Sequence, residues 1–134
     1  MELKISSDPR WLRLVRNVMH EVSRQAGFGE TERHQIALAV DEALANVIKH
    51  SYKGQPDGAI SLTCQAENGS LEVVMRHWGE RFDPERAAEL APDELRAGGR
   101  GLFLIRATMD EVEFDHDGEC SMVRLRKHVK TTAQ

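Results

Sequence analysis

Apolar residues recur at two different spacings along the chain, and each change of spacing marks an expected element. Two stretches repeat every three or four residues, as in amphipathic helices. The first begins at Asp8-Pro9, because Asp favours the N-cap and Pro the first helical position, and it ends near Gly27. The second extends from about Glu30 to His50. A short third helix is expected over residues 102–109.

Apolar and polar residues alternate elsewhere, which predicts half-buried strands. The expected strands are residues 3–5, 60–66, 71–77, about 112–114 and 120–126. Asn68-Gly69 and Asp117-Gly118 are hairpin signals that join neighbouring strands. The pattern therefore predicts an α/β two-layer sandwich, in which a mostly antiparallel mixed sheet carries three helices on one face.

Residues 78–100 break both patterns with prolines and glycines, and a short helix near 84–90 is the one element expected there. A long irregular segment inside a compact domain is usually a lid or a binding loop. The 134 residues fit one domain without internal repeats, and the polar residues 130–134 are expected to fray.

Composition narrows the function classes. The chain is 40% hydrophobic and 30% charged with a net charge of −4, and it has no sustained Lys/Arg run, so a nucleic-acid surface is not indicated. No apolar stretch reaches membrane-spanning length, and the first residues lack a signal-peptide layout. Cys64 and Cys120 are far apart in sequence, and we expect two free thiols in a reducing cytoplasm.

The first candidate for chemistry is a carboxylate and an amide on the second helix. Glu42 and Asn46 are four residues apart and so share one helix face, beside the small residues Ala39 and Ala43. An amide oxygen is a hard ligand that suits Mg²⁺, and a carboxylate can accept a proton from an attacking hydroxyl. The alternative is an ordinary solvated helix face.

Two glycine-containing segments are the other candidates. Residues 98–101 place three glycines at a helix start, where backbone N–H groups and the helix dipole favour a phosphate, although a simple lid hinge is the alternative. The segment fits neither a Rossmann turn nor a P-loop. Residues 77–84 follow a strand, where Gly79 permits an unusual turn and Phe82 could line a flat pocket; an ordinary strand exit is the alternative.

Together these motifs resemble the GHKL ATPase superfamily, and within it the anti-sigma-factor serine kinases. The resemblance covers about residues 5–127. Residues 41–50 are similar to its N box, and Gly99-x-Gly101-Leu102 to its last glycine box. Residues 82–84 and 109–112 are also typical of this branch. The resemblance implies the Bergerat ATP-binding fold as a single domain over residues 1–134, with an ATP lid at about 79–100.

The resemblance also implies roles for individual residues. Glu42 would be the general base toward a serine hydroxyl, and Asn46 would bind Mg²⁺. The remaining implied nucleotide-binding residues are Lys49, His50, His77, Gly79, Phe82, Gly99, Arg100, Gly101, Leu102 and Ser121. Of these, residues 99–102 would cradle the phosphates, and Ser121 would supply a hydroxyl near the nucleotide.

One position departs from the family pattern. The middle box normally begins with Asp, which accepts the adenine amino group, and His77 stands there instead; Arg81 replaces its second glycine. A neutral His can accept one hydrogen bond, but an unsatisfied buried donor costs about 1–3 kcal/mol.

Three functions are compatible with these residues. The resemblance implies an ATP- and Mg²⁺-dependent kinase that phosphorylates a serine of an anti-anti-sigma (STAS-type) protein, sequesters a sigma factor and forms a homodimer. One alternative is a regulatory binding module of the same fold whose nucleotide binding His77 has impaired. Another is the detached ATPase domain of a sensor histidine kinase, which the absence of a helix bearing a phosphoacceptor His disfavours.

Overall fold

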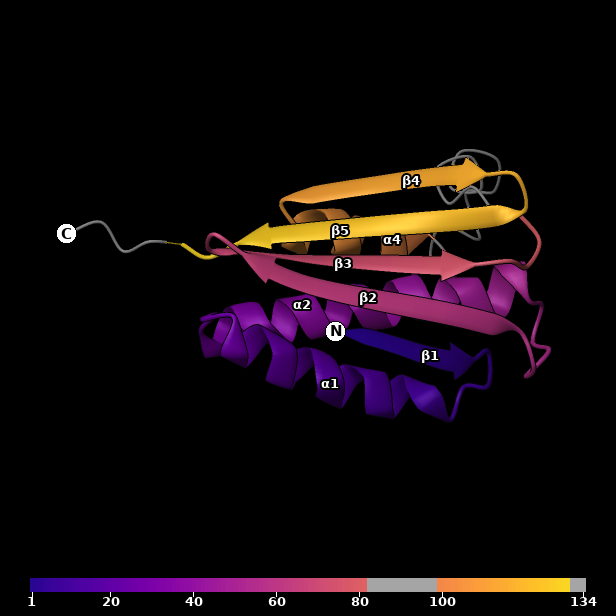
Figure 1. Ribbon diagram of the computed structural model, residues 1–134, viewed down its shortest axis with the longest axis horizontal. Helices are drawn as coiled ribbons and strands as arrows, with labels where there is room; N and C mark the ends of the chain where they lie inside the picture. Colours follow the sequence, from indigo (N-terminus) through magenta and orange to yellow (C-terminus); the bar gives the residue numbers. More distant parts are fainter. Residues whose placement is uncertain (82–98, 131–134) are drawn as a thin grey trace.

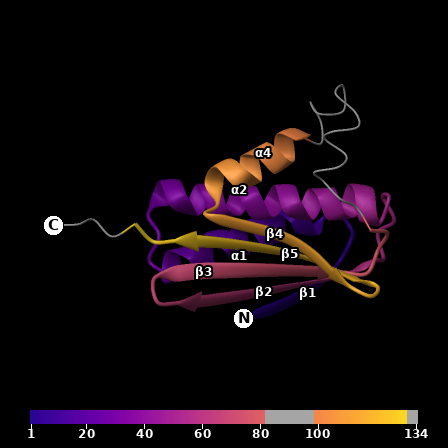
Figure 2. The same ribbon diagram turned by 90° about the horizontal axis from the view of Figure 1, so that it is seen from above.

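The protein forms two layers in a computed structural model that describes residues 1–81 and 99–130. One layer is a five-stranded sheet in the order β1-β2-β3-β5-β4, and every neighbouring pair is antiparallel. Three helices, α1, α2 and α4, cover one face of this sheet (Figures 1 and 2). The predicted two-layer α/β sandwich is confirmed.

The strands lie close to their predicted positions. They are β1 (Glu2–Ser6), β2 (Ala59–Glu67), β3 (Ser70–His77), β4 (Glu111–Asp117) and β5 (Cys120–His128). Asn68 and Gly69 both have positive φ (52° and 76°), as the predicted tight hairpin requires. In the second hairpin Asp117 still pairs with Cys120, so the central residues are Gly118-Glu119, one position later than predicted.

The helices differ from the sequence prediction at their ends. Helix α1 (Trp11–Gln25) begins two residues after Pro9, because the Asp8 carboxylate accepts the Arg10 N–H at 2.9 Å and holds a turn before the helix. Helix α2 (Glu30–Asn46) continues into a π-helical turn, η1 (Val47–Ser51), which the sequence did not indicate. Helix α4 (Gly99–Thr108) begins three residues before the predicted third helix and ends one residue before its predicted end.

The core lies between the two layers. Large side chains that are 0–1% exposed come from both, including Ile36, Leu44, Leu62, Met75 and Leu125. No helix within residues 1–81 and 99–130 is long and apolar enough to cross a membrane. Both cysteines are free thiols, as predicted, and the predicted helix near 84–90 lies outside the described residues.

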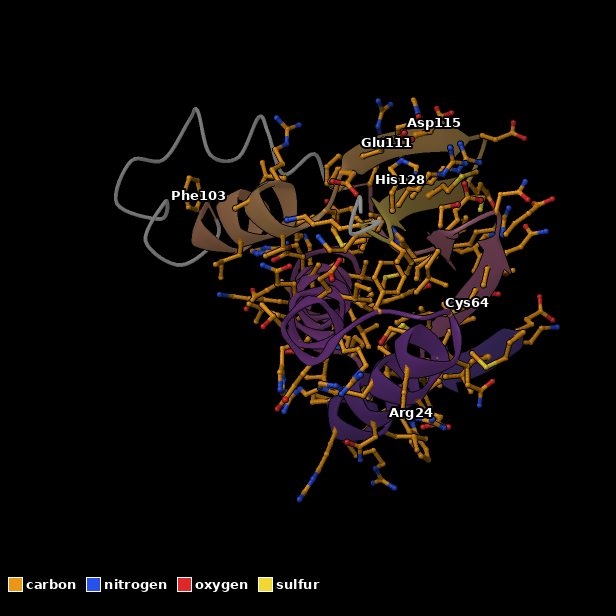
Figure 3. All side chains as sticks on the ribbon, turned by 90° about the vertical axis from the view of Figure 1, so that its left-hand side faces the viewer. Arg24, Cys64, Phe103, Glu111, Asp115 and His128 are labelled. Carbon is orange, nitrogen blue, oxygen red and sulfur yellow. The ribbon has the colours of Figure 1, made fainter. Side chains whose placement is uncertain are left out.

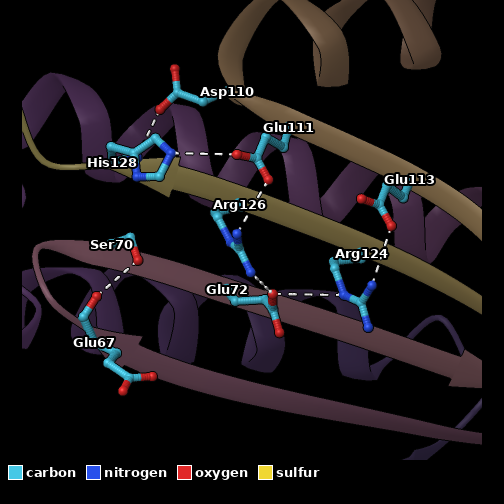
Figure 4. A network of polar contacts seen from close by, with 9 residues as sticks. All are labelled: Glu67, Ser70, Glu72, Asp110, Glu111, Glu113, Arg124, Arg126 and His128. Atoms are coloured by element: carbon cyan, nitrogen blue, oxygen red, sulfur yellow. Dashed lines mark hydrogen bonds and ion pairs between the residues drawn. The ribbon is translucent and has the colours of Figure 1, made fainter.

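The opposite face of the sheet carries charged residues in a cross-strand network (Figure 4). Glu72 on β3 forms ion pairs with Arg124 and Arg126 on β5. These arginines also contact Glu113 at 3.2 Å and Glu111 at 3.4 Å on β4. The ladder keeps this face largely charged, although Val74 of β3 also lies on it beside Arg124, and most apolar side chains of the same strands face the helices.

Candidate functional site

The carboxylate and the amide of α2 lie against the first turn of α4. Glu42 and Asn46 are both half-buried, on the side of α2 that faces Gly101. A Cβ atom added to Gly101 would lie 2.9 Å from Glu42 Oε2 and 3.7 Å from Asn46 Nδ2. The glycine segment and the Glu/Asn face thus meet, and any side chain at position 101 would enter the space that they share.

The other residues of the last glycine box differ in what they offer to a ligand: two offer backbone N–H groups, and one has a buried side chain. Gly99 and Arg100 belong to the first turn of α4, so their backbone N–H groups lie at a helix N-terminus, where an anion is favoured. Leu102 is buried at 8% exposure beside the core, and it is not among the described residues that line the cavity discussed next. Phe103 projects from α4 away from the sheet and is 70% exposed (Figure 3).

A cavity of about 270 Å³ lies between α2, η1 and α4 on one side and the ends of β3, β4 and β5 on the other. Its volume is close to the lower end of the range for ligand pockets, about 300–1,000 Å³. Apolar and polar side chains share its lining, which includes Ala43, Asn46, Val47, His77, Phe114 and Ser121. Three predicted site residues, Asn46, His77 and Ser121, therefore meet at one hollow.

His77 is the most unusual polar residue of the cavity. It is 4% exposed at the end of β3, and its Nδ1 has no hydrogen-bond partner in the described part of the chain. Burial lowers the pKa of the His77 imidazole to about 4, because a charged ring would lose its hydration there. The ring is therefore neutral at pH 7 and retains an unused hydrogen-bonding atom.

Tyr52 supports the turn that follows His77. Its hydroxyl donates to the Ala59 carbonyl at 2.5 Å and accepts the Trp78 N–H at 2.9 Å, while its ring meets His77 edge-on at 6.4 Å. A Cβ atom on Gly79 would lie 2.7 Å from the Ser51 carbonyl oxygen and 2.8 Å from the Tyr52 ring. Gly79 thus allows close packing of this turn on η1, and it is not among the described residues of the cavity lining.

The remaining predicted site residues lie elsewhere. Lys49 is exposed and His50 is half-buried on η1, and neither is among the described residues that line the cavity. Arg81, which stands at the second glycine of the middle box and was not a predicted site residue, does line the cavity and is exposed. Phe82 and most of the predicted lid lie outside the described residues. Tyr52 was missed by sequence reasoning, since its contacts join positions 26 residues apart that no local pattern connects.

Comparison with known proteins identifies the family. The family described as "Histidine kinase-like ATPase domain" matches residues 5–127. The chain belongs to this family. Two relatives match most of the chain. The serine-protein kinase RsbW of Listeria innocua is 34% identical over 129 residues, which cover 90% of this chain and 82% of that protein. The serine-protein kinase RsbW of Bacillus subtilis is 30% identical over 127 residues, which cover 88% and 79%.

Solved structures show the same histidine kinase-like fold. A crystal structure of the RsbU and RsbW domains of a Mycobacterium tuberculosis protein aligns with a TM-score of 0.68 at 16% identity, covering 100% of this chain and 34% of that one. The histidine kinase domain of the blue-light activated kinase from Erythrobacter litoralis aligns with a TM-score of 0.58 at 16% identity, covering 88% and 60%. At these identities the likeness concerns the fold.

The chemistry of this ATPase-family cavity fits a nucleotide. The Nδ1 of His77, which has no hydrogen-bond partner in the described part of the chain, leaves a hydrogen bond available, and the missing side chain at Gly101 lets the first turn of α4 approach Glu42 closely. Asn46 lines the cavity and could bind Mg²⁺ through its amide oxygen, since Mg²⁺ is usually held by one or two protein ligands together with substrate phosphates. Among the described residues no group of three or more His, Cys, Asp or Glu could hold a metal ion.

Proposed function

We propose that this chain is an ATP-dependent serine-protein kinase that phosphorylates an anti-anti-sigma (STAS-type) protein and, in another state, sequesters a sigma factor. The observation that carries the proposal is the contact of Gly101 with Glu42 and Asn46 beside the cavity, in a chain that is 30–34% identical to serine-protein kinases over most of its length. That contact brings a candidate base, a candidate metal ligand and a helix N-terminus to one point.

Each group has a distinct task in phosphoryl transfer. Glu42 accepts the proton of the substrate serine while the serine hydroxyl oxygen attacks the γ-phosphorus of ATP. The first turn of α4, residues 99–102, presents backbone N–H groups to the phosphates. Asn46 holds Mg²⁺, which neutralises phosphate charge when bound. His77 and Ser121 contact the nucleobase at the sheet end of the cavity.

The test is phosphoryl transfer from radiolabelled ATP to the anti-anti-sigma protein encoded nearest to this chain in its genome. We expect transfer to serine that requires Mg²⁺ and that falls at least a hundredfold in Glu42→Ala, because general bases contribute about 10²–10⁴ to such rates. Glu21→Ala is the matched control, since Glu21 is an exposed glutamate of α1 whose side chain contacts Arg24 and Gln25. Full transfer by Glu42→Ala would exclude Glu42 as the base.

The partners and the assembly belong to the same proposal. The protein acts in the cytoplasm as a homodimer and binds its sigma factor when the anti-anti-sigma protein is phosphorylated. Analytical ultracentrifugation with the sigma factor, with and without the phosphorylated and unphosphorylated partner, tests this order. A chain that binds its sigma factor but fails to bind ATP at millimolar concentration would instead be the nucleotide-independent binding module.

A further inference from the structure

The sheet end of the cavity presents a row of three polar side chains. His77 on β3 pairs with Ser121 on β5, and Ser121 pairs with His116 on β4. Residues paired in this way lie side by side on one face of a sheet, and this row shares its face with the buried residues Val123 and Leu125 two and four positions along β5. All three members of the row line the cavity.

All three members of this row can either donate or accept a hydrogen bond when their imidazoles are neutral. A neutral imidazole carries one N–H donor and one acceptor nitrogen, and a change of tautomer exchanges them. A serine hydroxyl donates or accepts as it rotates. His77 is buried and its Nδ1 is unpartnered, so no neighbour in the described chain fixes its tautomer.

A carboxylate in this row would behave differently, since it only accepts. The carboxylate among the described residues that line the cavity is Asp115, on the edge strand β4. Asp115 pairs with Met122, one residue out of phase with the Ser121–His116 pair, so its side chain leaves the opposite face of the sheet. Its Oδ1 accepts the backbone N–H of His116 at 2.8 Å and lies 4.0 Å from the ring Nδ1 of His116, at the exposed edge of the row. No acceptor-only group therefore stands in the row itself.

Purine nucleotides differ in what position 6 of the base presents. Adenine has an amino group there, which needs an acceptor, whereas hypoxanthine and guanine have an oxo group, which needs a donor. A site with a buried acceptor-only group rejects the oxo purines, because two acceptors would face each other without a proton. A site with an ambivalent imidazole and hydroxyl satisfies either group.

We propose that the cavity of this chain binds 6-oxo purine nucleotides as well as adenosine nucleotides, with His77 and Ser121 matching whichever group the base presents. The inference rests on the proposed nucleotide-binding function and deepens it. The dissociation constants of inosine and adenosine nucleotides should differ by less than about tenfold, since His77 and Ser121 can offer an acceptor to the amino group or a donor to the oxo group. His77 thus determines which nucleotides the protein can accept as phosphoryl donor.

Calorimetric titration of the wild-type chain with ADP and with inosine diphosphate, each with Mg²⁺ at pH 7.5, tests the inference without any variant. These two probes share the ribose and the phosphates and differ only in the base, whose position 6 carries an amino group in ADP and an oxo group in inosine diphosphate. We expect dissociation constants within tenfold of each other. ADP binding with inosine diphosphate more than tenfold weaker would overturn the inference and leave the proposed function standing, whereas no binding of either nucleotide at millimolar concentration would overturn both.

Two variants test whether His77 is the residue responsible. His77→Asp installs an acceptor-only group, and it should raise the inosine-to-adenosine ratio of dissociation constants by about ten- to a hundredfold. His77→Asn keeps both a donor and an acceptor, and its ratio should stay within tenfold of the wild-type ratio. His34→Asp makes the same chemical change on the exposed surface of α2 and should leave the ratio unchanged. An unchanged ratio in folded His77→Asp would show that His77 does not read the base.

Discussion

Substitution of Gly101 by alanine separates the stability of the protein from its activity. The added methyl group would lie 2.9 Å from Glu42 Oε2, and 3.4 Å is the lower end of ordinary van der Waals contact. The carboxylate must therefore retreat by about 0.5 Å. Asn46 Nδ2, at 3.7 Å, is already at a normal distance and need not move. The substitution thus displaces the candidate base and leaves the candidate metal ligand in place.

The effect on folding should be small or favourable. Alanine is more stable than glycine in a helix by up to about 1 kcal/mol, and Gly101 lies in the first turn of α4. The atom that must move is the end of a flexible side chain, so its displacement costs little. We expect a free energy of unfolding within about 1 kcal/mol of wild type, with alanine the more stable variant.

The effect on catalysis should be larger. A misplacement of about 1 Å can cost about a hundredfold in rate, so a displacement of about half that distance predicts a loss of about tenfold in kcat. The assay is steady-state phosphoryl transfer, with urea unfolding of the same preparation. Gly29→Ala is the control, because a Cβ atom there would meet nothing closer than Glu32 Oε1 at 3.9 Å. Wild-type kcat in Gly101→Ala would refute the assigned contact between α4 and the base.

Three further predictions concern titration, packing and thiol reactivity. The pKa of His77 is about 4 in the folded state, so as pH falls below about 6.5 the unfolded chain protonates His77 before the folded chain does. The free energy of unfolding should therefore fall by about 1–2 kcal/mol between pH 7.5 and 5. Urea unfolding should show a smaller decrease over this range in His77→Gln. Tyr52→Phe removes one hydroxyl that joins two backbone groups and should lower the free energy of unfolding by about 1–3 kcal/mol in the same assay. Burial raises the pKa of the Cys64 thiol to about 11, so only about one molecule in a thousand is thiolate at pH 8, and mass spectrometry should find iodoacetamide on Cys120 well before Cys64.

The order of the elements followed from periodicity, because each helix and strand buries one side. The stripe of α2 was predicted from its spacing, and its members Ile36, Val40 and Leu44 are all 0% exposed. Element ends were less certain, since they depend on single hydrogen bonds. The carboxylate of Asp8 binds the N–H of Arg10 and delays α1, and no pattern of apolar residues records such a bond.

The site was predictable where its residues share one element and less so where several segments meet. Glu42 and Asn46 are four residues apart on a helix, so their common face follows from the sequence. Gly79 was assigned to the nucleotide because residues 77–81 resemble the middle glycine box of the family, and its packing against Tyr52 could not be inferred. That contact requires the π-helical turn of η1, which positions Tyr52 beside the end of β3.

The cavity exists because side chains are small at the positions where the two layers would otherwise touch. Along α2, the large residues Ile36 and Leu44 reach the sheet and leave no space, whereas Ala43 lines the hollow with a single methyl group. Ser121 ends the inward-facing row of β5 with a small side chain that also lines the hollow. Protein interiors are usually packed densely, so an open hollow of about 270 Å³ between the two layers is a feature that needs an explanation. A hollow with an unpartnered imidazole at one end and a carboxylate and an amide beside the other is therefore best explained as space reserved for a ligand, and bound nucleotide should raise the unfolding temperature.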